Sequence, residues 1–185
     1  ALLAPHTRLV NRHLWHGRAG LFHDGLDAHN RPVPVHSIHN QTLALHAGLQ
    51  PRHHARMIAH SLAPYARGEK IEGALPSSYW VTYVYEALAR AGHGRDVVAH
   101  ILRNFSKMIP DGGTWEHFEA VVGDTTGSRS HAWSAHPLYH FARILGGVTQ
   151  AAPAWRRVRF APEFAVPGLN RVRLAVPTPR GLVES

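Results

Sequence analysis

Hydrophobic residues recur at helical spacing along most of the first 145 residues of the chain. The clearest stripe lies between Ser77 and Gly92, where large apolar side chains repeat at i, i+4, i+5 and i+8. It consists of Tyr79, Trp80, Tyr83, Val84, Ala87, Leu88 and Ala91. Serine is a favourable N-cap and glycine a favourable C-terminal stop, so the pattern predicts a helix that Ser77 caps and Gly92 ends.

The same reasoning predicts five more helices, bounded by capping residues, prolines and glycines. They run from about Thr7 to Trp15, from Ser37 to Gly48, from Pro51 to Pro64, from about Asp96 to Pro110, and from His131 or Ser134 to Gly146 and Gly147. After Val148 the period changes, because residues 157–160 and 171–176 alternate arginine with apolar side chains, as half-buried strands do. The predicted fold class is therefore mainly α: three helical hairpins within residues 1–147, then a small β region over residues 148–185.

Composition is that of an ordinary globular protein: 185 residues, 44% hydrophobic and 17% charged, enough for one domain or one and a half. The absence of cysteine excludes disulfides and thiolate metal sites. No stretch approaches the roughly 20 apolar residues of a membrane span, so we expect no membrane partner. The N-terminus has no basic-then-apolar signal pattern, although a start at Ala1 leaves room for a signal upstream.

The net charge of +8 raises the question of an anionic partner such as nucleic acid. Nearly all of the 20 basic residues are arginines, and they are scattered along the chain instead of gathered on one face. The densest group, residues 156–159, begins just before the predicted strand of residues 157–160 and overlaps it. We therefore expect no nucleic-acid partner.

The candidate chemistry lies in residues 112–117, Gly-Gly-Thr-Trp-Glu-His, and in residues 128–134, Ser-Arg-Ser-His-Ala-Trp-Ser. A carboxylate beside a tryptophan, with a histidine and a second tryptophan a short loop away, is typical of sites that bind and cleave sugars. The indole stacks on the apolar face of the pyranose, the carboxylate handles a proton or a water, and the imidazole binds a hydroxyl. By themselves, these residues fit a solvated surface turn better than a catalytic site, because most acidic residues of a soluble protein are solvated.

The ordered series of motifs resembles the C-terminal part of bacterial α-L-rhamnosidases of glycoside hydrolase family 78. The series comprises residues 21–27, 36–40, 79–92, 114–116, 128–134, 146–148, Pro153, 157–162 and 176–181. The resemblance covers nearly the whole chain. It implies that residues 1–147 are about half of an (α/α)6 catalytic barrel and that residues 148–185 begin a C-terminal β-sandwich. The chain then resembles a fragment at both ends, and its partners would include the missing half of its own barrel.

The resemblance also implies an inverting hydrolysis of terminal α-L-rhamnosides, which requires a general acid and a general base but no cofactor. Glu116 matches the family's general base, which activates water. His131 matches a sugar-contacting histidine, and Trp115 and Trp133, with Trp80 as a weaker candidate, could stack on the sugar. A rhamnosyl glycoside is therefore the expected partner. A bacterial cytoplasmic location is favoured, and a secreted or periplasmic one stays open.

The general acid has no counterpart in residues 1–110, so we expect the isolated chain to be inactive. The other acidic candidates are Asp24 and Asp27, in a turn whose family counterpart is structural, and Asp111, Glu119 and Asp124, which lie close to Glu116 in sequence. We also expect the isolated chain to be marginally stable, because half a barrel exposes the inner faces of its helices. The short loop between Glu116 and His131, with Ser130 and Ala132, departs from the family pattern and leaves sugar preference open.

Two alternatives remain. One is an (α/α)6 glycosidase for a different sugar. The other is a histidine-rich metal-binding module, because the chain has 17 histidines, with the pairs His36 and His39, His53 and His54, and His136 and His140 at close spacing. No His-Glu-x-x-His pattern is present, and a histidine-biased surface would give the same composition.

Overall fold

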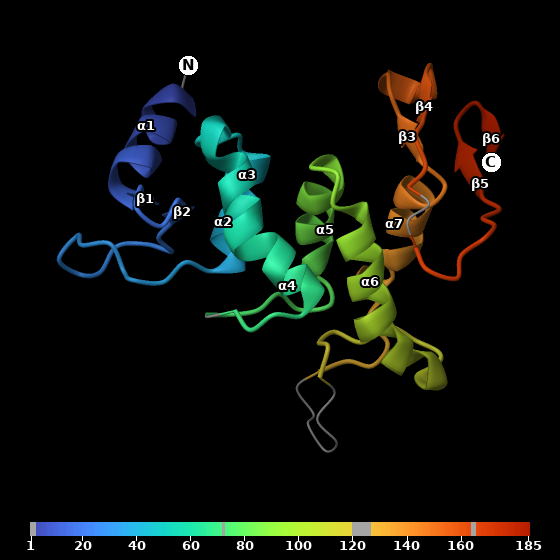
Figure 1. The fold of residues 1–185 in the computed structure, drawn as a ribbon, viewed down its shortest axis with the longest axis horizontal. Helices are drawn as coiled ribbons and strands as arrows, with labels where there is room; N and C mark the ends of the chain where they lie inside the picture. The colour runs from blue at the N-terminus through green and yellow to red at the C-terminus, as the bar shows by residue number, and fades with distance from the viewer. Residues whose placement is uncertain (1–2, 72, 120–126, 164–165) are drawn as a thin grey trace. The chain divides into compact units, whose positions relative to one another are not determined.

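The computed structural model describes residues 3–71, 73–119, 127–163 and 166–185 (Figure 1). About 46% of the chain is helical, and the strands of the described residues form three two-stranded antiparallel pairs, which confirms the mainly α class. Contacts divide the chain into two compact units, residues 1–92 and residues 93–185. In the ranges described, every helix is too short or too polar to cross a membrane.

In the first unit, helix α1 (Leu3–Leu14) leads directly into strand β1 (Trp15–His16), which pairs antiparallel with β2 (Leu21–Phe22). The helix starts before Pro5, earlier than predicted, because proline in a first turn lacks only an N–H that has no intrahelical partner there. Phe22 is buried and belongs to a small core with Ala44 and Met57. The hairpin is thereby anchored to the helices that follow.

Helix α2 (Ile38–His46) begins as predicted, because the Ser37 hydroxyl accepts the backbone N–H of Asn40 at 3.3 Å. Its buried Gln41 joins the helix to the hairpin. The Gln41 side chain accepts the Phe22 N–H at 2.8 Å and donates to the Phe22 carbonyl at 2.8 Å. One amide thus satisfies both backbone groups of a core residue.

The third predicted helix is longer than expected and irregular. It consists of a 3-10 turn η1 (Pro51–His53), α3 (His54–Met57), a π-helical turn η2 (Ile58–Leu62) and α4 (Ala63–Arg67). The prediction that it ends near Pro64 is wrong. The wide π turn precedes the proline, which then occupies the first turn of α4, where it needs no N–H donor; the helix ends at Gly68 with φ +86°.

Helix α5 (Val81–Arg90) begins later than predicted: its N-cap is Trp80, which makes no side-chain cap bond, so the predicted Ser77 cap is wrong. The Ser77 hydroxyl instead accepts the Trp80 N–H at 3.2 Å in the turn before the helix. The helix packs against α2. Its buried face is formed by Val81, Val84, Tyr85, Ala87 and Leu88. The residues of the predicted stripe that precede Val81 lie in the turn, and Tyr79 and Tyr83 are among the exposed aromatic side chains.

In the second unit, α6 (Gly94–Phe105) packs against α7 (Pro137–Ile144). The α-helix ends at Phe105, earlier than predicted, and the chain continues as a 3-10 helix η3 (Ser106–Asp111). Pro110 cannot donate an N–H to residue 106 in an α-helical turn, and the tighter turn ends at Gly112, which has φ +69°. A short 3-10 turn η4 (Ala132–Ser134) precedes α7.

The β region contains two hairpins. Strand β3 (Val148–Gln150) pairs with β4 (Val158–Phe160) around the turn η5 (Pro153–Trp155), and β5 (Ala175–Thr178) pairs with β6 (Gly181–Glu184). The expected half-burial of β4 is wrong: all three of its residues are exposed, because a two-stranded hairpin covers neither of its own faces. The strand predicted over residues 171–176 begins only at Ala175.

Gly147, at the junction of α7 and β3, is the glycine that the packing requires most clearly. Its φ is +66°, and a Cβ atom there would lie 2.1 Å from the backbone nitrogen of Pro162. Any other residue would force the two backbone segments apart.

The half-barrel expected for residues 1–147 and the β-sandwich expected to begin within residues 148–185 stay predictions.

Candidate functional site

Two segments that the sequence singled out lie side by side in the second unit. The His131 N–H donates to the Thr114 carbonyl at 2.7 Å, and the Glu116 N–H donates to the Ser128 carbonyl at 2.8 Å. The Thr114 hydroxyl adds a 2.7 Å bond to the His131 carbonyl. The structure therefore brings together residues 112–117, the Glu116 turn, and residues 128–134, the His131 segment.

The Glu116 turn is anchored on its helical side by the residues before the glutamate. The Trp115 indole Nε1 donates to Asp111 Oδ2 at 2.9 Å, and the Trp115 backbone N–H points to the Met108 sulfur at 3.3 Å. Arg129 donates to the same Asp111 oxygen at 3.3 Å and lies over the Trp115 ring, 5.4 Å from its centroid. Trp115 thus contacts three residues, which makes it a structural support for the turn.

A second anchor lies after the glutamate. Phe118 packs edge-on against Phe105 and His100 of α6, with ring centroids 5.3 and 5.6 Å apart. Aromatic pairs of this geometry add to the free energy of simple burial, so the turn is fixed from both ends. Sequence reasoning missed Phe118 and Asp111 as positioning residues; the spacing of Asp111 four residues before Trp115 was the available signal.

The Glu116 side chain is half-buried and keeps access to solvent. Its Oε2 accepts the backbone N–H of Ser128 at 3.1 Å, which orients the carboxylate. A carboxylate oriented by a backbone donor and open to water can act as a general base.

His131 is half-buried and lies 5.5 Å from the Trp133 ring, centroid to centroid, at an interplanar angle of 44°. Trp133 is 71% exposed, which is unusual for the largest apolar side chain. An exposed indole with a polar neighbour is the usual form of a sugar-stacking surface. Of the candidate tryptophans, Trp133 is the one whose exposure suits this role.

Trp80 lies in the first unit and is not part of this arrangement. Its ring is 4.3 Å from that of His39 and 5.4 Å from that of Tyr83. These contacts make Trp80 a member of an aromatic group at the start of α5. Its predicted role in sugar binding stays a prediction.

A hollow of about 680 Å³ lies beside His131, bounded by α6, η3 and α7. Its polar lining is limited to a few groups, among them Thr114, Ser130 and His131; the rest is mainly apolar, including Leu102, Phe105 and Leu138. Glu116 and Trp133 do not line it. The hollow is therefore an apolar surface beside the His131 segment and not a cavity around the Glu116 carboxylate.

Most of the other acidic candidates have structural partners. Asp24 Oδ1 accepts the Ser37 N–H at 2.8 Å, and the Asp27 carboxylate accepts the N–H groups of His29 and Arg31 and pairs with the Arg31 guanidinium. The backbone N–H of Arg31 contributes most to lowering the pKa of Asp27. Asp111 is engaged by Trp115 and Arg129, as described above. Glu119 is exposed, and Asp124 lies outside the described residues.

The histidine pairs suggested by spacing differ in the structure, because His53 and His54 have separate contacts whereas His136 and His140 are neighbours. His53 packs against Trp15, and His54 Nε2 lies 2.9 Å from the Leu49 carbonyl. The rings of His136 and His140 are neighbours at 5.4 Å, and burial lowers the pKa of His140 to about 3. Within the described ranges, the histidines that gather closely enough to hold an ion are His16, His23 and His36.

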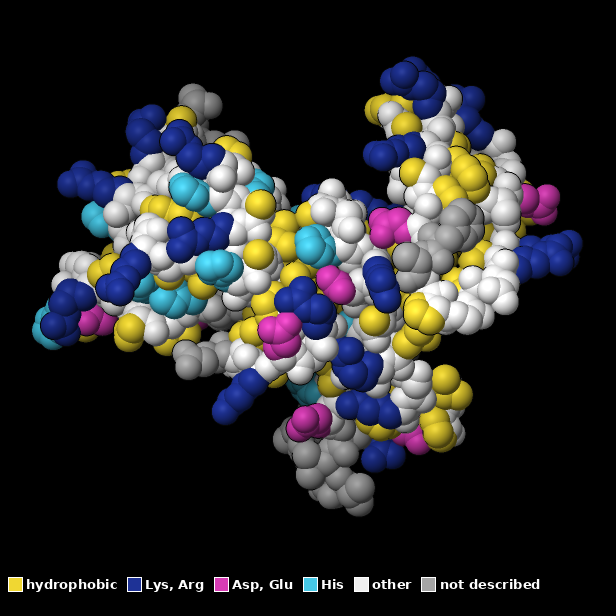
Figure 2. Space-filling view, viewed as in Figure 1, with side chains coloured by type: hydrophobic (Ala, Val, Ile, Leu, Met, Phe, Trp, Pro, Cys, Tyr) yellow, Lys and Arg dark blue, Asp and Glu magenta, His cyan; other side chains and the backbone are white. Residues whose placement is uncertain are grey.

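Basic side chains do not gather into one patch on the face of the described residues that Figure 2 shows. Figure 2 shows lysine and arginine side chains spread over both units on the face in view, interrupted by acidic, histidine and apolar side chains. This distribution agrees with the scatter of arginines along the sequence.

Comparison with solved structures finds a likeness to the crystal structure of a GH78 family rhamnosidase of Bacillus sp. GL1, with 27% sequence identity and a TM-score of 0.72. The match covers 96% of this chain and 19% of that protein, so the chain spans about a fifth of the length of the structure that it resembles. No protein-family model and no curated protein sequence match the chain. At this coverage the likeness extends over both units.

Proposed function

We propose that the chain is part of an inverting glycoside hydrolase that removes terminal α-L-rhamnose from glycosides or polysaccharides, with Glu116 as the general base. The observation that carries the proposal is the likeness of nearly the whole chain to a GH78 family rhamnosidase. The local arrangement supports it, because a solvent-accessible carboxylate, a histidine and an exposed indole occur on two hydrogen-bonded segments.

In an inverting reaction, the base removes a proton from water as the water attacks the anomeric carbon, while a carboxylic acid on the opposite side protonates the leaving oxygen. Glu116 would take the proton from water. His131 would donate a hydrogen bond to a sugar hydroxyl, and Trp133 would cover the apolar face or methyl group of the rhamnose. No metal or other cofactor is needed for these steps.

The general acid would come from a segment upstream of this chain. Among the described acidic residues near Glu116, Asp111 is held by Trp115 and Arg129, which suits a positioning role. The two carboxyl groups of an inverting glycosidase stand about 6.5–9.5 Å apart on opposite sides of the sugar. Glu119 follows Glu116 by only three residues, and we do not assign it the role of the acid on the opposite side of the sugar. The remaining half of the barrel is therefore the partner that completes the site.

The test is hydrolysis of a chromogenic α-L-rhamnoside by a protein extended upstream to a complete barrel, comparing the wild type with Glu116→Gln. The variant keeps the size of the side chain but cannot accept a proton, so kcat should fall by a factor of roughly 10² to 10⁴. Glu119→Gln is the matched control. It removes the same charge from an exposed position three residues away, and its kcat should equal that of the wild type.

Each failure has a distinct meaning. Full activity of Glu116→Gln would remove the glutamate from the mechanism while leaving the substrate class intact. A folded, complete protein that does not hydrolyse the rhamnoside would refute the rhamnosidase proposal, and other α-L- and β-D-glycosides would then distinguish a glycosidase for a different sugar.

A further inference from the structure

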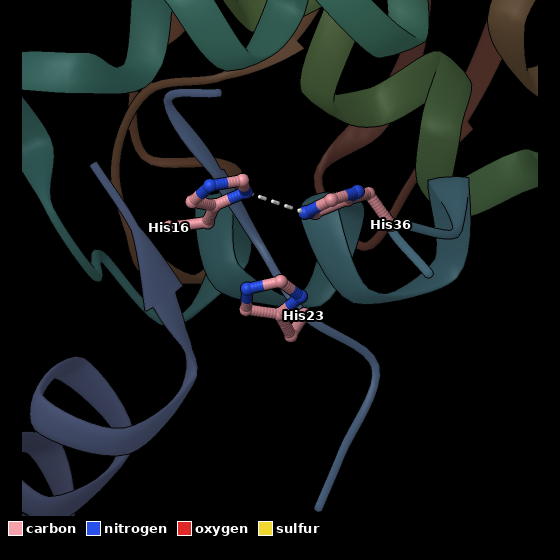
Figure 3. A group of neighbouring side chains, drawn as sticks. All are labelled: His16, His23 and His36. Atoms are coloured by element: carbon pink, nitrogen blue, oxygen red, sulfur yellow. Dashed lines mark hydrogen bonds between the residues drawn. The ribbon is translucent and has the colours of Figure 1, made fainter. Parts of the chain in front are cut away.

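We propose that His16, His23 and His36 form a binding site for a divalent transition-metal ion, with Zn²⁺ as the best match. The three side chains lie in the first unit and come from β1, from the residue after β2, and from the segment before α2 (Figure 3). The proposal is independent of the glycosidase proposal, whose carboxylate and sugar-binding residues lie in the second unit.

The distances fit a shared ion. One ring nitrogen from each histidine lies within 4.8 Å of the others, and His16 Nδ1 is 3.1 Å from His36 Nε2. Ligand nitrogens about 2.0–2.1 Å from a tetrahedral Zn²⁺ are roughly 3.3 Å apart. The His16–His36 pair already has this spacing, and His23 needs only a small approach.

The rings now stack against one another, with centroids 4.6–5.3 Å apart and interplanar angles between 15° and 33°. Their lone pairs converge on one point only after rotation about the Cβ–Cγ bonds. That torsion is broad and costs little for histidine. His23 Nδ1 is buried without a hydrogen-bond partner, and coordination of a metal ion by this nitrogen would take the place of the missing hydrogen bond.

The backbone that carries the histidines is fixed independently of any ion. The His23 N–H donates to the Leu14 carbonyl at 2.8 Å, and the His23 carbonyl accepts the Asn40 side chain at 3.0 Å. Beside His36, the Ser37 N–H donates to Asp24 at 2.8 Å. Binding therefore requires side-chain rotation but no folding of a loop, which lowers its entropic cost.

The surroundings of His36 also suit metal binding. Imidazole must be neutral to coordinate a metal ion. Burial, then the neighbouring His23 and His16, lower the pKa of His36, while Asp24 acts in the opposite direction. Three nitrogen ligands without sulfur select borderline ions such as Zn²⁺, Co²⁺, Ni²⁺ or Cu²⁺ over Mg²⁺ or Ca²⁺, and leave one tetrahedral position to water.

The experiment is a calorimetric titration of the EDTA-treated, dialysed chain with Zn²⁺, repeated with Co²⁺ to follow the visible absorption of a tetrahedral complex. We expect one tight site per chain. His16→Gln, His23→Gln and His36→Gln should each weaken Zn²⁺ binding by roughly tenfold or more. His29→Gln and His13→Gln are the matched controls, because both histidines are exposed, lie in the same unit and stand outside the group. Their affinity should stay within about twofold of the wild type.

A second measurement needs no variant and so does not depend on whether the variants fold. In wild-type protein with ¹⁵N-labelled histidine, the first equivalent of Zn²⁺ should shift three ring resonances, which assignment would place at His16, His23 and His36. The proposal is overturned if the first equivalent shifts other histidines, if binding at these three is absent, or if well-folded variants bind as tightly as the controls.

Discussion

Thr114 and His131 are joined by two hydrogen bonds of 2.7 Å: the His131 N–H donates to the Thr114 carbonyl, and the Thr114 hydroxyl donates to the His131 carbonyl. This double link holds the turn with Glu116 against the segment with His131 and Trp133. One hydroxyl therefore connects the proposed base to the proposed sugar-binding residues, although it touches neither water nor sugar in the proposed mechanism.

Replacing that hydroxyl should disturb the site without unfolding the protein. Thr114→Val keeps the shape but leaves the His131 carbonyl with one bond fewer, so we expect a loss of about 1 kcal/mol in the free energy of unfolding. In the complete enzyme, kcat should fall several-fold, because the two segments lose one of the hydrogen bonds that align them. Thr114→Ser keeps the hydroxyl and should recover most of the activity. Equal kcat values for the valine and serine variants would show that the hydroxyl does not position the site.

The exposed indole of Trp133 should contribute to substrate binding more than to stability. Stacking on a sugar ends when Trp133→Ala removes the ring, so KM for a rhamnoside should rise roughly ten- to a hundredfold, equivalent to about 1.5–3 kcal/mol. The melting temperature should barely change, since the side chain is 71% exposed. Trp133→Phe should retain part of the affinity. A large drop in melting temperature with unchanged KM would instead assign the indole to packing.

Gln41 is the clearest structural test in the first unit. Its fully buried amide satisfies both the N–H and the carbonyl of Phe22. Gln41→Leu fills similar space but leaves both backbone groups without that partner, which should cost about 2–5 kcal/mol in unfolding free energy. Chemical denaturation followed by circular dichroism measures this loss. If the variant is as stable as the wild type, water or a rearranged backbone must satisfy Phe22.

Local sequence signals predicted the parts of the fold that local chemistry determines. The Ser37 cap forms as expected, because a hydroxyl and an N–H three residues later need no tertiary contact. Ser77 makes the same kind of bond, but in the turn before α5 and not at its N-cap. The continuation of the helix through Pro64 could not be read locally, since it depends on the preceding π turn, and that turn is stabilised by packing of Ile58 and Leu62 in the core.

The candidate site also combines residues that local sequence points to with contacts that only the tertiary fold creates. The glutamate, the histidine and the tryptophans of residues 114–133 are candidates from residue type, spacing and the family resemblance, and the structure brings the two segments together. Sequence spacing suggested histidine partners such as His36 with His39, whereas the hairpin places His36 beside His16 and His23. Those partners are 20 and 13 residues away, and only the tertiary fold reveals them.

Two buried histidines should make the second unit sensitive to acid. Burial, more than neighbouring cationic groups such as Arg103 and His136, lowers the pKa values of His100 and His140 to about 3. Because an unfolded histidine has a pKa near 6.5, the unfolded chain binds more protons between pH 6.5 and pH 3. Stability is therefore full above pH 6.5 and falls with pH across this window.

Between pH 6 and pH 5 the loss should be about 1.2 kcal/mol for each histidine, or about 2.4 kcal/mol for both. Urea unfolding at the two pH values measures it, and His140→Gln should remove about half of the dependence. Histidine ring resonances that titrate near pH 6.5 for both residues would show that they are accessible to protons in the folded state and would contradict the prediction.

The isolated chain should associate with itself, because several large apolar side chains of the second unit face solvent. Leu138 is 77% exposed and Ile109 is 74% exposed, and both line the apolar hollow beside His131. Fully burying such a side chain is worth roughly 1.5–3 kcal/mol, so their contact with another surface is a substantial driving force. In the proposed parent enzyme, the rest of the barrel would provide that surface.

Size-exclusion chromatography of the 185-residue chain should show concentration-dependent oligomers, and the double variant Leu138→Gln with Ile109→Gln should shift the equilibrium toward the monomer. Leu43→Gln, which changes an exposed leucine of the first unit, is the control and should leave the oligomers unchanged. A wild-type chain that is monomeric at high concentration and melts cooperatively would show that the 185 residues are stable without further covering.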